Sequence, residues 1–258
     1  MKKLIAGLGV ALAMAVTPAA AQDCPAKVRI GVEGAYPPFS EVTPEGRLTG
    51  FDIDMALALC QAMAAECTLV QQDWDGIIPG LLARKYDAII ASMSITEERR
   101  QKVDFTDKYY QTPARFIARK GAGFEISADG LKGKKIGVQR ATIHDNYISD
   151  NYPAADIVRY GTQDEVYLDL KAGRIDMALQ DSVAASDGFL KQPGGEEFEF
   201  IGPSLTDPKW FGEGAGIAIR KNDDRLRQCF NAAIDKVRAN GTYQRINDKY
   251  FDFDVYGG

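Results

Sequence analysis

Short apolar runs typical of β-strands alternate along this chain with longer stretches in which apolar and polar residues recur at helical spacing. The strand-like runs lie at residues 27–32, 67–70, 86–94, 114–120, 134–138, 156–160, 174–181 and 214–221. The predicted helices lie at residues 51–65 and 75–85, from about residue 142, and at 162–173, 223–241 and 242–251. Strands separated by helices of this length are typical of parallel α/β units, so the sequence predicts an α/β fold.

The first 21 residues have the pattern of a secretory signal peptide. Lys2 and Lys3 precede an uncharged stretch rich in alanine, leucine and valine, which ends with the cleavage pattern Ala19-x-Ala21. An uncleaved membrane anchor is the competing interpretation, but Pro18 and the small residues beside it favour cleavage. Since the rest of the chain has no apolar run near the roughly 20 residues that span a bilayer, we expect an exported, soluble protein.

The net charge of the chain limits the classes of partner that it can bind. Removing Lys2 and Lys3 from the 31 basic residues leaves 29 against 36 acidic residues, a net charge of −7. An acidic protein of this kind is a poor match for nucleic acid or for an anionic membrane surface.

Four cysteines follow the predicted cleavage site, and pairing is their default state in an oxidising compartment. Cys60 and Cys67 are seven residues apart, so we expect them to join the end of a helix to the next strand. Cys24 and Cys229 then form the second pair. No C-x-x-C spacing supports a metal site. Because bridged Cα atoms lie within about 7 Å of each other, both ends of the chain belong to one folding unit.

This pairing favours two lobes, with a chain that leaves the first lobe and later returns to it. The candidate crossings are residues 109–114 and 205–214, where proline and glycine cluster between strand-like runs. Residues 212–216, GEGAG, lack the G-x-G-x-x-G spacing and a preceding strand, so we assign them to the return crossing and not to nucleotide binding. Ligands of open α/β sheets bind beyond the carboxyl ends of the strands, which here predicts a site between the lobes.

One group of candidate residues suits a cation. Glu33 and Tyr36 follow the first strand, and Trp74 stands between a strand and a helix. Together they offer one carboxylate and two aromatic faces, which complement a cation on a flat or aliphatic stem. A surface glutamate beside two ordinary aromatic residues remains the alternative.

A second group suits a carboxylate. Ser92 and Ser94 end a strand, Thr96 or Ser94 caps the next helix, and Arg99 lies in its first turn. Free N–H groups and a guanidinium together bind a carboxylate through paired hydrogen bonds. A helix start with solvent-exposed arginines is the other interpretation.

Two further loops carry polar groups after strands. Thr142 is expected to cap a helix and to leave the N–H groups near Ile143 facing an anion. His144 is the only histidine, which excludes a multi-histidine metal site and leaves a structural role open. Asp181 ends an apolar strand, where it either receives an ammonium group or caps the following helix.

Several stretches resemble the family 3 extracellular solute-binding proteins, which deliver polar amino acids to ABC importers. GFDIDMALALCQAM, residues 50–63, is similar to the signature of that family. IIASMSITEERRQKVDFTDKYY, AGRIDMALQDSVAASDGFLKQPGG and the terminal YFDFDVYGG resemble the lysine-arginine-ornithine-binding and histidine-binding members. The resemblance runs from about Val28 to Gly258. It implies a two-lobed periplasmic binding protein of type II, each lobe a mostly parallel sheet flanked by helices, with a double interlobe crossing and no cofactor or metal.

The resemblance also implies a role for each candidate. Arg99, with Ser94 and the backbone near Ile143, matches the clamp for the α-carboxylate of the ligand. Asp181 matches the acceptor of the α-ammonium group, with the Ser92 carbonyl and the Ser94 hydroxyl beside it. The expected ligand-binding residues are Glu33, Tyr36, Trp74, Ala91, Ser92, Ser94, Arg99, Gln139, Thr142, Ile143, His144 and Asp181.

For the side chain of the ligand, Tyr36 and Trp74 match an aromatic pair that encloses it, and Glu33 stands where binders of basic amino acids have aspartate. The chain departs from the pattern at Ala91, which replaces a serine, and at Ile143 and His144, which replace smaller or amide residues. EGAYPPF and WDGIIPGL also look like the opine-binding relatives, and a planar guanidinium stacks well on indole.

We therefore expect a monomeric periplasmic receptor of an ABC importer, without enzymatic activity, that closes two lobes on a basic L-amino acid. Arginine is the first expected ligand, then lysine or ornithine, and an inner-membrane permease is the expected partner. Lobe 1 is expected to comprise residues 22–110 plus 213–258, and lobe 2 residues 111–212. The alternatives are an opine or histidine receptor, or an exported dehydratase that uses Glu33, Asp181 and His144 for acid–base chemistry.

Overall fold

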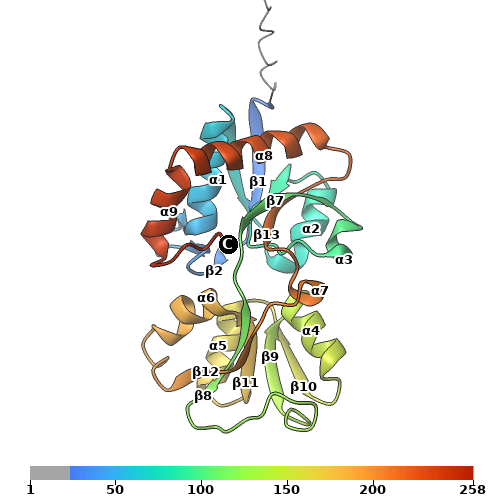
Figure 1. The fold of residues 1–258 in the computed structure, drawn as a ribbon, viewed down its shortest axis with the longest axis vertical. Helices are drawn as coiled ribbons and strands as arrows, with labels where there is room; N and C mark the ends of the chain where they lie inside the picture. The colour runs from blue at the N-terminus through green and yellow to red at the C-terminus, as the bar shows by residue number, and fades with distance from the viewer. Residues whose placement is uncertain (1–23, 258) are drawn as a thin grey trace, which may run out of the picture.

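The computed structural model describes residues 24–257, so the predicted signal peptide lies outside the described residues. The chain forms two lobes that are stacked along the long axis of the molecule, each built on a five-stranded sheet with helices around it (Figure 1). This arrangement confirms the predicted α/β class. From residue 24 to residue 257, no helix combines the length and the apolar character that crossing a membrane requires.

The sheet of lobe 1 has the spatial order β5-β1-β6-β13-β7. Because β1 is parallel to β5 and β6 while β13 is antiparallel to β6 and β7, four strands share one direction and β13 is reversed. The strands are β5 (Glu66–Gln71), β1 (Lys27–Val32), β6 (Ala88–Ile89), β13 (Ala215–Ile219) and β7 (Asp104–Tyr110). The helices of this lobe are α1 (Phe51–Ala62), α2 (Trp74–Leu82), α3 (Glu97–Arg100), α8 (Asp224–Ala239) and α9 (Thr242–Tyr250).

The sheet of lobe 2 repeats this plan in the order β10-β9-β11-β8-β12. β9 is parallel to β10 and β11, whereas β8 is antiparallel to β11 and β12 and is the reversed strand. The strands are β10 (Asp156–Tyr160), β9 (Lys135–Gln139), β11 (Met177–Asp181), β8 (Ala114–Arg119) and β12 (Phe198–Leu205). The helices are α4 (Ile143–Asn151), α5 (Gln163–Lys171), α6 (Ser182–Ala185), the π-helix η1 (Ser186–Leu190) and α7 (Pro208–Phe211).

Two segments connect the sheets. Residues 111–113 lead from β7 in lobe 1 to β8 in lobe 2, and residues 206–214, which include α7, lead from β12 back to β13. The connections run side by side through the middle of the molecule, because β7 pairs with β13 and β8 pairs with β12 (Figure 1).

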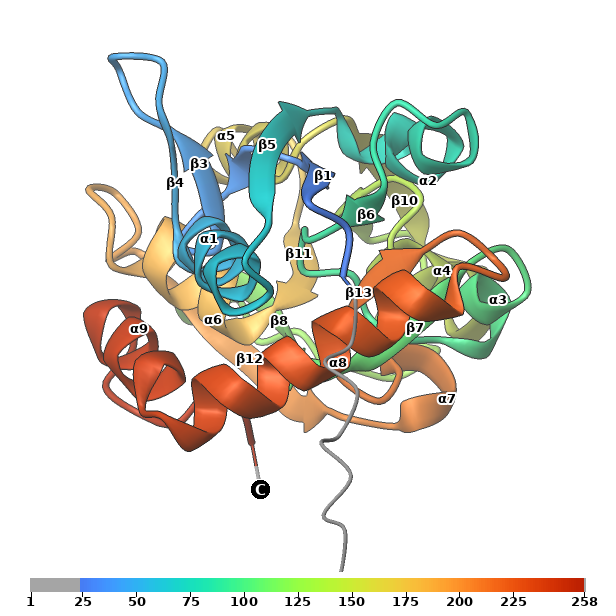
Figure 2. The ribbon, with the colours of Figure 1, turned by 90° about the horizontal axis from the view of Figure 1, so that it is seen from above.

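Apolar side chains cover both faces of each sheet, as expected for strands that are mostly parallel. In lobe 1, α1, α8 and α9 enclose one buried cluster and α2 encloses the other. α8 lies across the end of the lobe, against β7 and β13 (Figure 2). Lobe 2 has one buried cluster beneath α4 and α7 and another beneath α5 and η1. The cluster beneath α1, α8 and α9 also includes Val183 and Ala184 of α6, so apolar packing joins the two lobes.

Both predicted disulfides are present. Cys60 at the end of α1 is bonded to Cys67 in β5, and Cys24 is bonded to Cys229 in α8, with Cα–Cα distances of 6.1 and 5.8 Å. The second bond joins residues 205 positions apart and fixes the start of the described chain to lobe 1.

The sequence pattern missed several elements. β7 and β12 were not predicted, and the region 35–49 forms a small sheet of β2 (Ala35–Tyr36), β3 (Ser40–Val42) and β4 (Leu48–Thr49) instead of a plain loop. The strand predicted over residues 86–94 is only β6, because Ser92 adopts a left-handed conformation with φ of 53°. β12 contains a Gly-Pro pair and is largely exposed, so its sequence is more typical of a turn than of a strand.

Candidate ligand-binding site between the lobes

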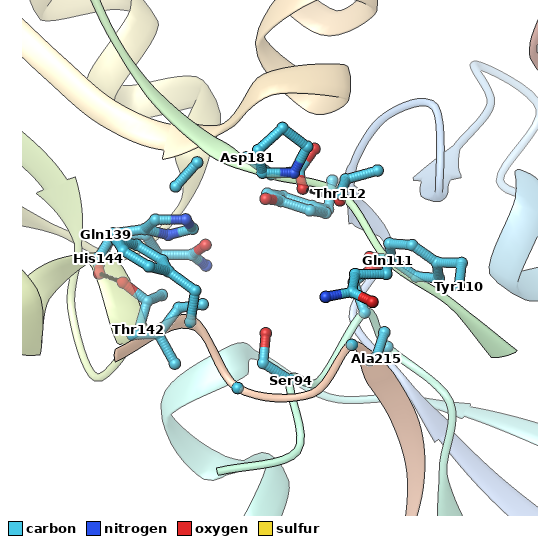
Figure 3. Close-up of a pocket in the computed structure, with 18 of the residues that line it drawn as sticks. Ser94, Tyr110, Gln111, Thr112, Gln139, Thr142, His144, Asp181 and Ala215 are labelled. Atoms are coloured by element: carbon cyan, nitrogen blue, oxygen red, sulfur yellow. Dashed lines mark hydrogen bonds between the residues drawn. The ribbon is translucent and has the colours of Figure 1, made fainter. Parts of the chain in front are cut away.

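A cavity of about 310 Å³ lies between the two lobes, near the lower end of the range for small-molecule sites. The strands β1, β6, β9 and β11 all point their carboxyl ends at it, as the rule for open α/β sheets predicts. All twelve residues expected from the sequence line this cavity. Figure 3 shows labelled side chains from both lobes around a common centre.

At one end of the cavity Arg99 is buried, with 8% of its surface exposed. Thr96 caps α3 by accepting a hydrogen bond from the Arg99 N–H, which settles the choice between Thr96 and Ser94. The guanidinium donates to the Ser94 carbonyl at 3.0 Å and lies 5.2 Å from the Trp74 ring centroid. Burial lowers the pKa of Arg99 to about 10, and within the described chain no carboxylate forms an ion pair with it. A buried cation in this state favours an anionic ligand group.

Thr142, Ile143 and His144 from lobe 2 line the same end of the cavity. Thr142 caps α4, as predicted, by accepting a hydrogen bond from the Asp145 N–H at 3.2 Å. Burial and the neighbouring Arg99 lower the pKa of His144 to about 3, so the imidazole is neutral at pH 7. Among the described residues that line this end of the cavity, Arg99 therefore carries the only positive charge.

Asp181 serves as the helix cap that was one of its two expected roles. One carboxylate oxygen accepts hydrogen bonds from the N–H groups of Val183 and Ala184 at 2.8 and 3.0 Å, at the start of α6. The other accepts a hydrogen bond from the hydroxyl of Thr112, a crossing residue that lies beside it in Figure 3. Burial raises the pKa of Asp181. The carboxylate also lines the cavity, so it is positioned for a cation as well.

Glu33 follows β1 and is 6% exposed. Burial raises its pKa from 4.5 to about 7, although a hydrogen bond from the Gln139 amide to its Oε1, at 2.6 Å, acts in the opposite direction. No lysine or arginine of residues 24–257 pairs with it. Glu33 is thus a second buried carboxylate without a cationic partner.

Aromatic residues form the walls between these charges. Trp74, the first residue of α2, donates a hydrogen bond from its indole N–H to the Ala141 carbonyl of the opposite lobe at 3.1 Å. Tyr36 lies in β2 and stacks on Phe39 with ring centroids 5.9 Å apart. Both rings line the cavity, so the Glu33 and Trp74 loops face the same cleft.

The lobes make direct contact across the cleft. Besides the Glu33–Gln139 and Trp74–Ala141 hydrogen bonds, Arg140 pairs with Asp75 and the Asn146 amide donates to Glu98 at 2.9 Å. Each of these contacts joins one lobe to the other. The structure is accordingly that of a closed cleft.

Sequence reasoning missed the residues of the crossings and of two other segments that complete the lining. The signal was available, because the predicted crossings pass through the interlobe cleft and their residues necessarily line it. The additional lining residues are Tyr110, Gln111, Thr112, Pro113, Ala114, Gln163, Thr206, Phe211, Gly212, Gly214, Ala215 and Gly257.

The chain matches known proteins along almost its whole length. The sequence profile described as bacterial extracellular solute-binding proteins, family 3, matches residues 28–253. The chain belongs to this family. The resemblance inferred from residues 50–63 and the later motifs is thereby confirmed.

Relatives within family 3 bind amino acids. A Pseudomonas aeruginosa protein named L-arginine-binding protein is 53% identical over 259 residues, which cover 100% of this chain and 99% of the relative. The histidine-binding and the lysine/arginine/ornithine-binding periplasmic proteins of Escherichia coli are each 45% identical, with 100% of both chains covered. A solved periplasmic binding protein of Salmonella typhimurium, described as highly specific for arginine, has a TM-score of 0.80 and 36% identity, covering 87% of this chain and 99% of its own.

These comparisons confirm the two-lobed fold and a binding function. The relatives are named as binding proteins, so the chain is an amino-acid-binding receptor of an extracellular family and not an enzyme.

Proposed function

We propose that this protein is the receptor of an ABC importer for a basic L-amino acid, with arginine preferred over lysine and ornithine. One observation carries the proposal: a closed cavity contains Arg99, Glu33 and Asp181, all buried and none paired with an opposite charge from the described chain. Their charges sum to −1. A basic amino acid carries one carboxylate and two cationic groups, a net charge of +1, so it offsets all three.

Each group of the ligand then has a partner. The α-carboxylate pairs with Arg99, with the backbone near Ile143 and the Ser94 hydroxyl beside it. The α-ammonium group pairs with Asp181 and the Ser92 carbonyl. A neutral amino acid would use the same contacts but would leave Glu33 buried and unpaired, which is costly.

The tail of the ligand extends between Tyr36 and Trp74 toward Glu33. A guanidinium is planar, stacks on indole and forms two parallel hydrogen bonds with a carboxylate, whereas an ammonium group is a compact point charge. The relative named L-arginine-binding protein and the solved protein described as highly specific for arginine support the same preference.

Binding is coupled to closure about the two crossings. We assign residues 22–110 plus 213–258 to lobe 1 and residues 111–212 to lobe 2. Ligand shifts the population toward the closed form because only that form brings Arg99 and Glu33 of lobe 1 together with Asp181 of lobe 2. A permease in the inner membrane then recognises the closed receptor, which acts as a monomer.

Calorimetric titration of the purified protein against arginine, lysine, ornithine, histidine, octopine and nopaline tests this assignment. We expect arginine to bind with a Kd below about 1 µM, which corresponds to roughly −8 kcal/mol, and to bind more tightly than the other ligands. If histidine or an opine bound more tightly than arginine, the assignment of arginine as the ligand would be wrong.

Two alternatives have distinct outcomes. The histidine-binding relative favours histidine as a second candidate, and the same titration decides between the two. An exported dehydratase would convert prephenate or arogenate, so incubation with either substrate followed by product analysis is expected to give no turnover.

We further propose that the protein reaches the periplasm by cleavage of residues 1–21. Mass spectrometry of the periplasmic protein is expected to find Gln22 at the N-terminus. An intact N-terminus in the membrane fraction would instead indicate an anchor.

A further inference from the structure

Asp52 is a buried carboxylate behind the ligand cavity that no proposed ligand contact uses. It lies in the first turn of α1 and has 0% of its surface exposed. Its Oδ1 accepts a hydrogen bond from the Tyr109 hydroxyl at 2.8 Å, and its Oδ2 accepts one from the Ser92 hydroxyl at 2.9 Å. The Tyr109 oxygen in turn accepts a hydrogen bond from the Ser92 N–H at 3.2 Å.

These three contacts fix Ser92 in an unusual conformation. Ser92 has φ of 53°, in the left-handed region that residues with a side chain rarely occupy. Backbone strain of this kind persists only where surrounding contacts enforce it, and such contacts cluster at functional sites. Here the hydroxyl of Ser92 bonds to Asp52 directly, and its N–H is linked to Asp52 through Tyr109.

The remaining polar group of Ser92 is its carbonyl. Ser92 lines the cavity, and no donor in residues 24–257 forms a hydrogen bond with this carbonyl oxygen. Ser92 is half-buried in the wall of this cavity. The contacts that hold Ser92 therefore leave one acceptor available to a ligand donor.

Asp52 also lacks a cation. No lysine or arginine in the described part of the chain contacts it, and burial raises its pKa to about 7 despite the hydrogen bonds that it accepts. A carboxylate in such surroundings attracts a cation placed one residue away. The ammonium group at the Ser92 carbonyl would be that cation.

We propose that Asp52 is a positioning residue for the α-ammonium group of the ligand: it holds the Ser92 carbonyl in place to accept the ammonium N–H and adds negative charge behind it. This inference rests on the proposed function, in which the cavity holds an α-amino acid. Asp52 touches no ligand atom and acts through Ser92.

The test compares two ligands that differ only in the α-amine. L-arginine carries it, whereas 5-guanidinopentanoate has the same guanidinium, chain and carboxylate without it. The Kd of arginine is measured by calorimetry and that of 5-guanidinopentanoate by displacement of bound arginine, in the wild type and in Asp52→Asn. We expect Asp52→Asn to raise the Kd of arginine at least tenfold and that of 5-guanidinopentanoate less than threefold.

Asp54→Asn is the matched control. Asp54 lies two residues after Asp52 in the first turn of α1, accepts a hydrogen bond from Lys249 at 2.7 Å and does not line the cavity. Both Kd values are therefore expected to stay unchanged in this variant. If Asp52→Asn does not fold, Tyr109→Phe removes one donor and keeps the carboxylate, and the same difference between the ligands is expected.

Equal increases for both ligands would show a general structural role, and an unchanged arginine Kd would show that Asp52 has no part in binding. Either result would overturn the inference while wild-type arginine binding upheld the proposed function. Failure of the wild type to bind any α-amino acid would instead reject the function itself.

Discussion

Replacing Glu33 with glutamine is expected to remove most of the preference of the cavity for a charged tail. Glu33→Gln keeps the shape of the side chain and removes its charge. L-citrulline is the matching ligand, because its urea group replaces the guanidinium of arginine at nearly the same size without the charge. The wild type and Glu33→Gln, each measured with both ligands, form a thermodynamic cycle. This cycle isolates the interaction free energy between the ligand tail and the Glu33 carboxylate.

The magnitude follows from the pKa of Glu33. Burial raises it from 4.5 to about 7, and each pKa unit corresponds to about 1.4 kcal/mol. With a neutral tail in the closed cleft at pH 7, Glu33 must stay ionised without a partner or take up a proton, at a cost of about 3 kcal/mol. A guanidinium removes this cost. The wild type is therefore expected to bind arginine at least about 100-fold more tightly than citrulline.

The preference for arginine over citrulline is expected to weaken as the pH falls. The pKa in the closed cleft is above the value in water, so the protonated form is the favoured one there, and protonation becomes easier as the pH falls from 7 toward 4.5. At pH 5.5 the cost for a neutral tail is only about 1 kcal/mol, and the preference for arginine is expected to fall to roughly tenfold. In Glu33→Gln the preference is expected to be below about tenfold at either pH.

Calorimetric titration of both ligands at pH 7 and pH 5.5 measures all of these values, and thermal unfolding checks that the variant is folded. If Glu33→Gln weakened the binding of arginine and of citrulline equally, Glu33 would support the structure and would not select for the charge of the ligand tail. A wild-type preference that is the same at both pH values would show that the pKa of Glu33 does not control selectivity.

Three further results are expected. Arg99→Ala removes the only buried cation found at the carboxylate end of the cavity in the described structure, so binding of every α-amino acid should fall below detection by calorimetry; retained binding would place the carboxylate elsewhere. Trp74→Leu keeps an apolar wall without the indole face, and the Kd of arginine should rise about tenfold and that of ornithine less, because stacking favours the planar guanidinium. The double substitution Cys24→Ser and Cys229→Ser should lower the Tm by about 10 °C or more, because the Cys24–Cys229 disulfide joins residues 205 positions apart. The Kd of arginine should stay unchanged.

Much of the fold could be predicted because the relevant signals are local. The apolar run at residues 27–32 coincides with β1, the run at 156–160 coincides with β10, and α8 and α9 lie within the stretches predicted as helical. β7 and β12 are different. Their sequences contain Asp, Lys, Gly and Pro, and they are strands because they pair with the reversed strands β13 and β8. Such pairing depends on distant segments, which a local pattern does not contain.

The candidate site also combines residues with a local sequence signal and residues that depend on distant contacts. Arg99, Thr142 and Asp181 were found because they stand at helix starts, which the sequence marks. The hydrogen bonds of Gln139 to Glu33 and of Trp74 to Ala141 join residues more than 60 positions apart and exist only when the lobes close. The role of Asp52 could not be predicted locally either, since its partner Ser92 lies 40 positions further along the chain.

Selectivity and closure have one physical origin in this cleft. The contacts at its mouth, Arg140 with Asp75 and Asn146 with Glu98, are solvent-exposed, and exposed contacts of this kind contribute about 0–1 kcal/mol each. Burying Arg99, Glu33 and Asp181 without partners costs several kcal/mol, which these contacts do not offset. A closed cleft without ligand is therefore disfavoured, and a ligand that supplies one anion and two cations removes the penalty at all three residues. A ligand that leaves one of the three unpaired gains less free energy from closure, so we expect it to bind more weakly and to shift the lobes less toward the closed form.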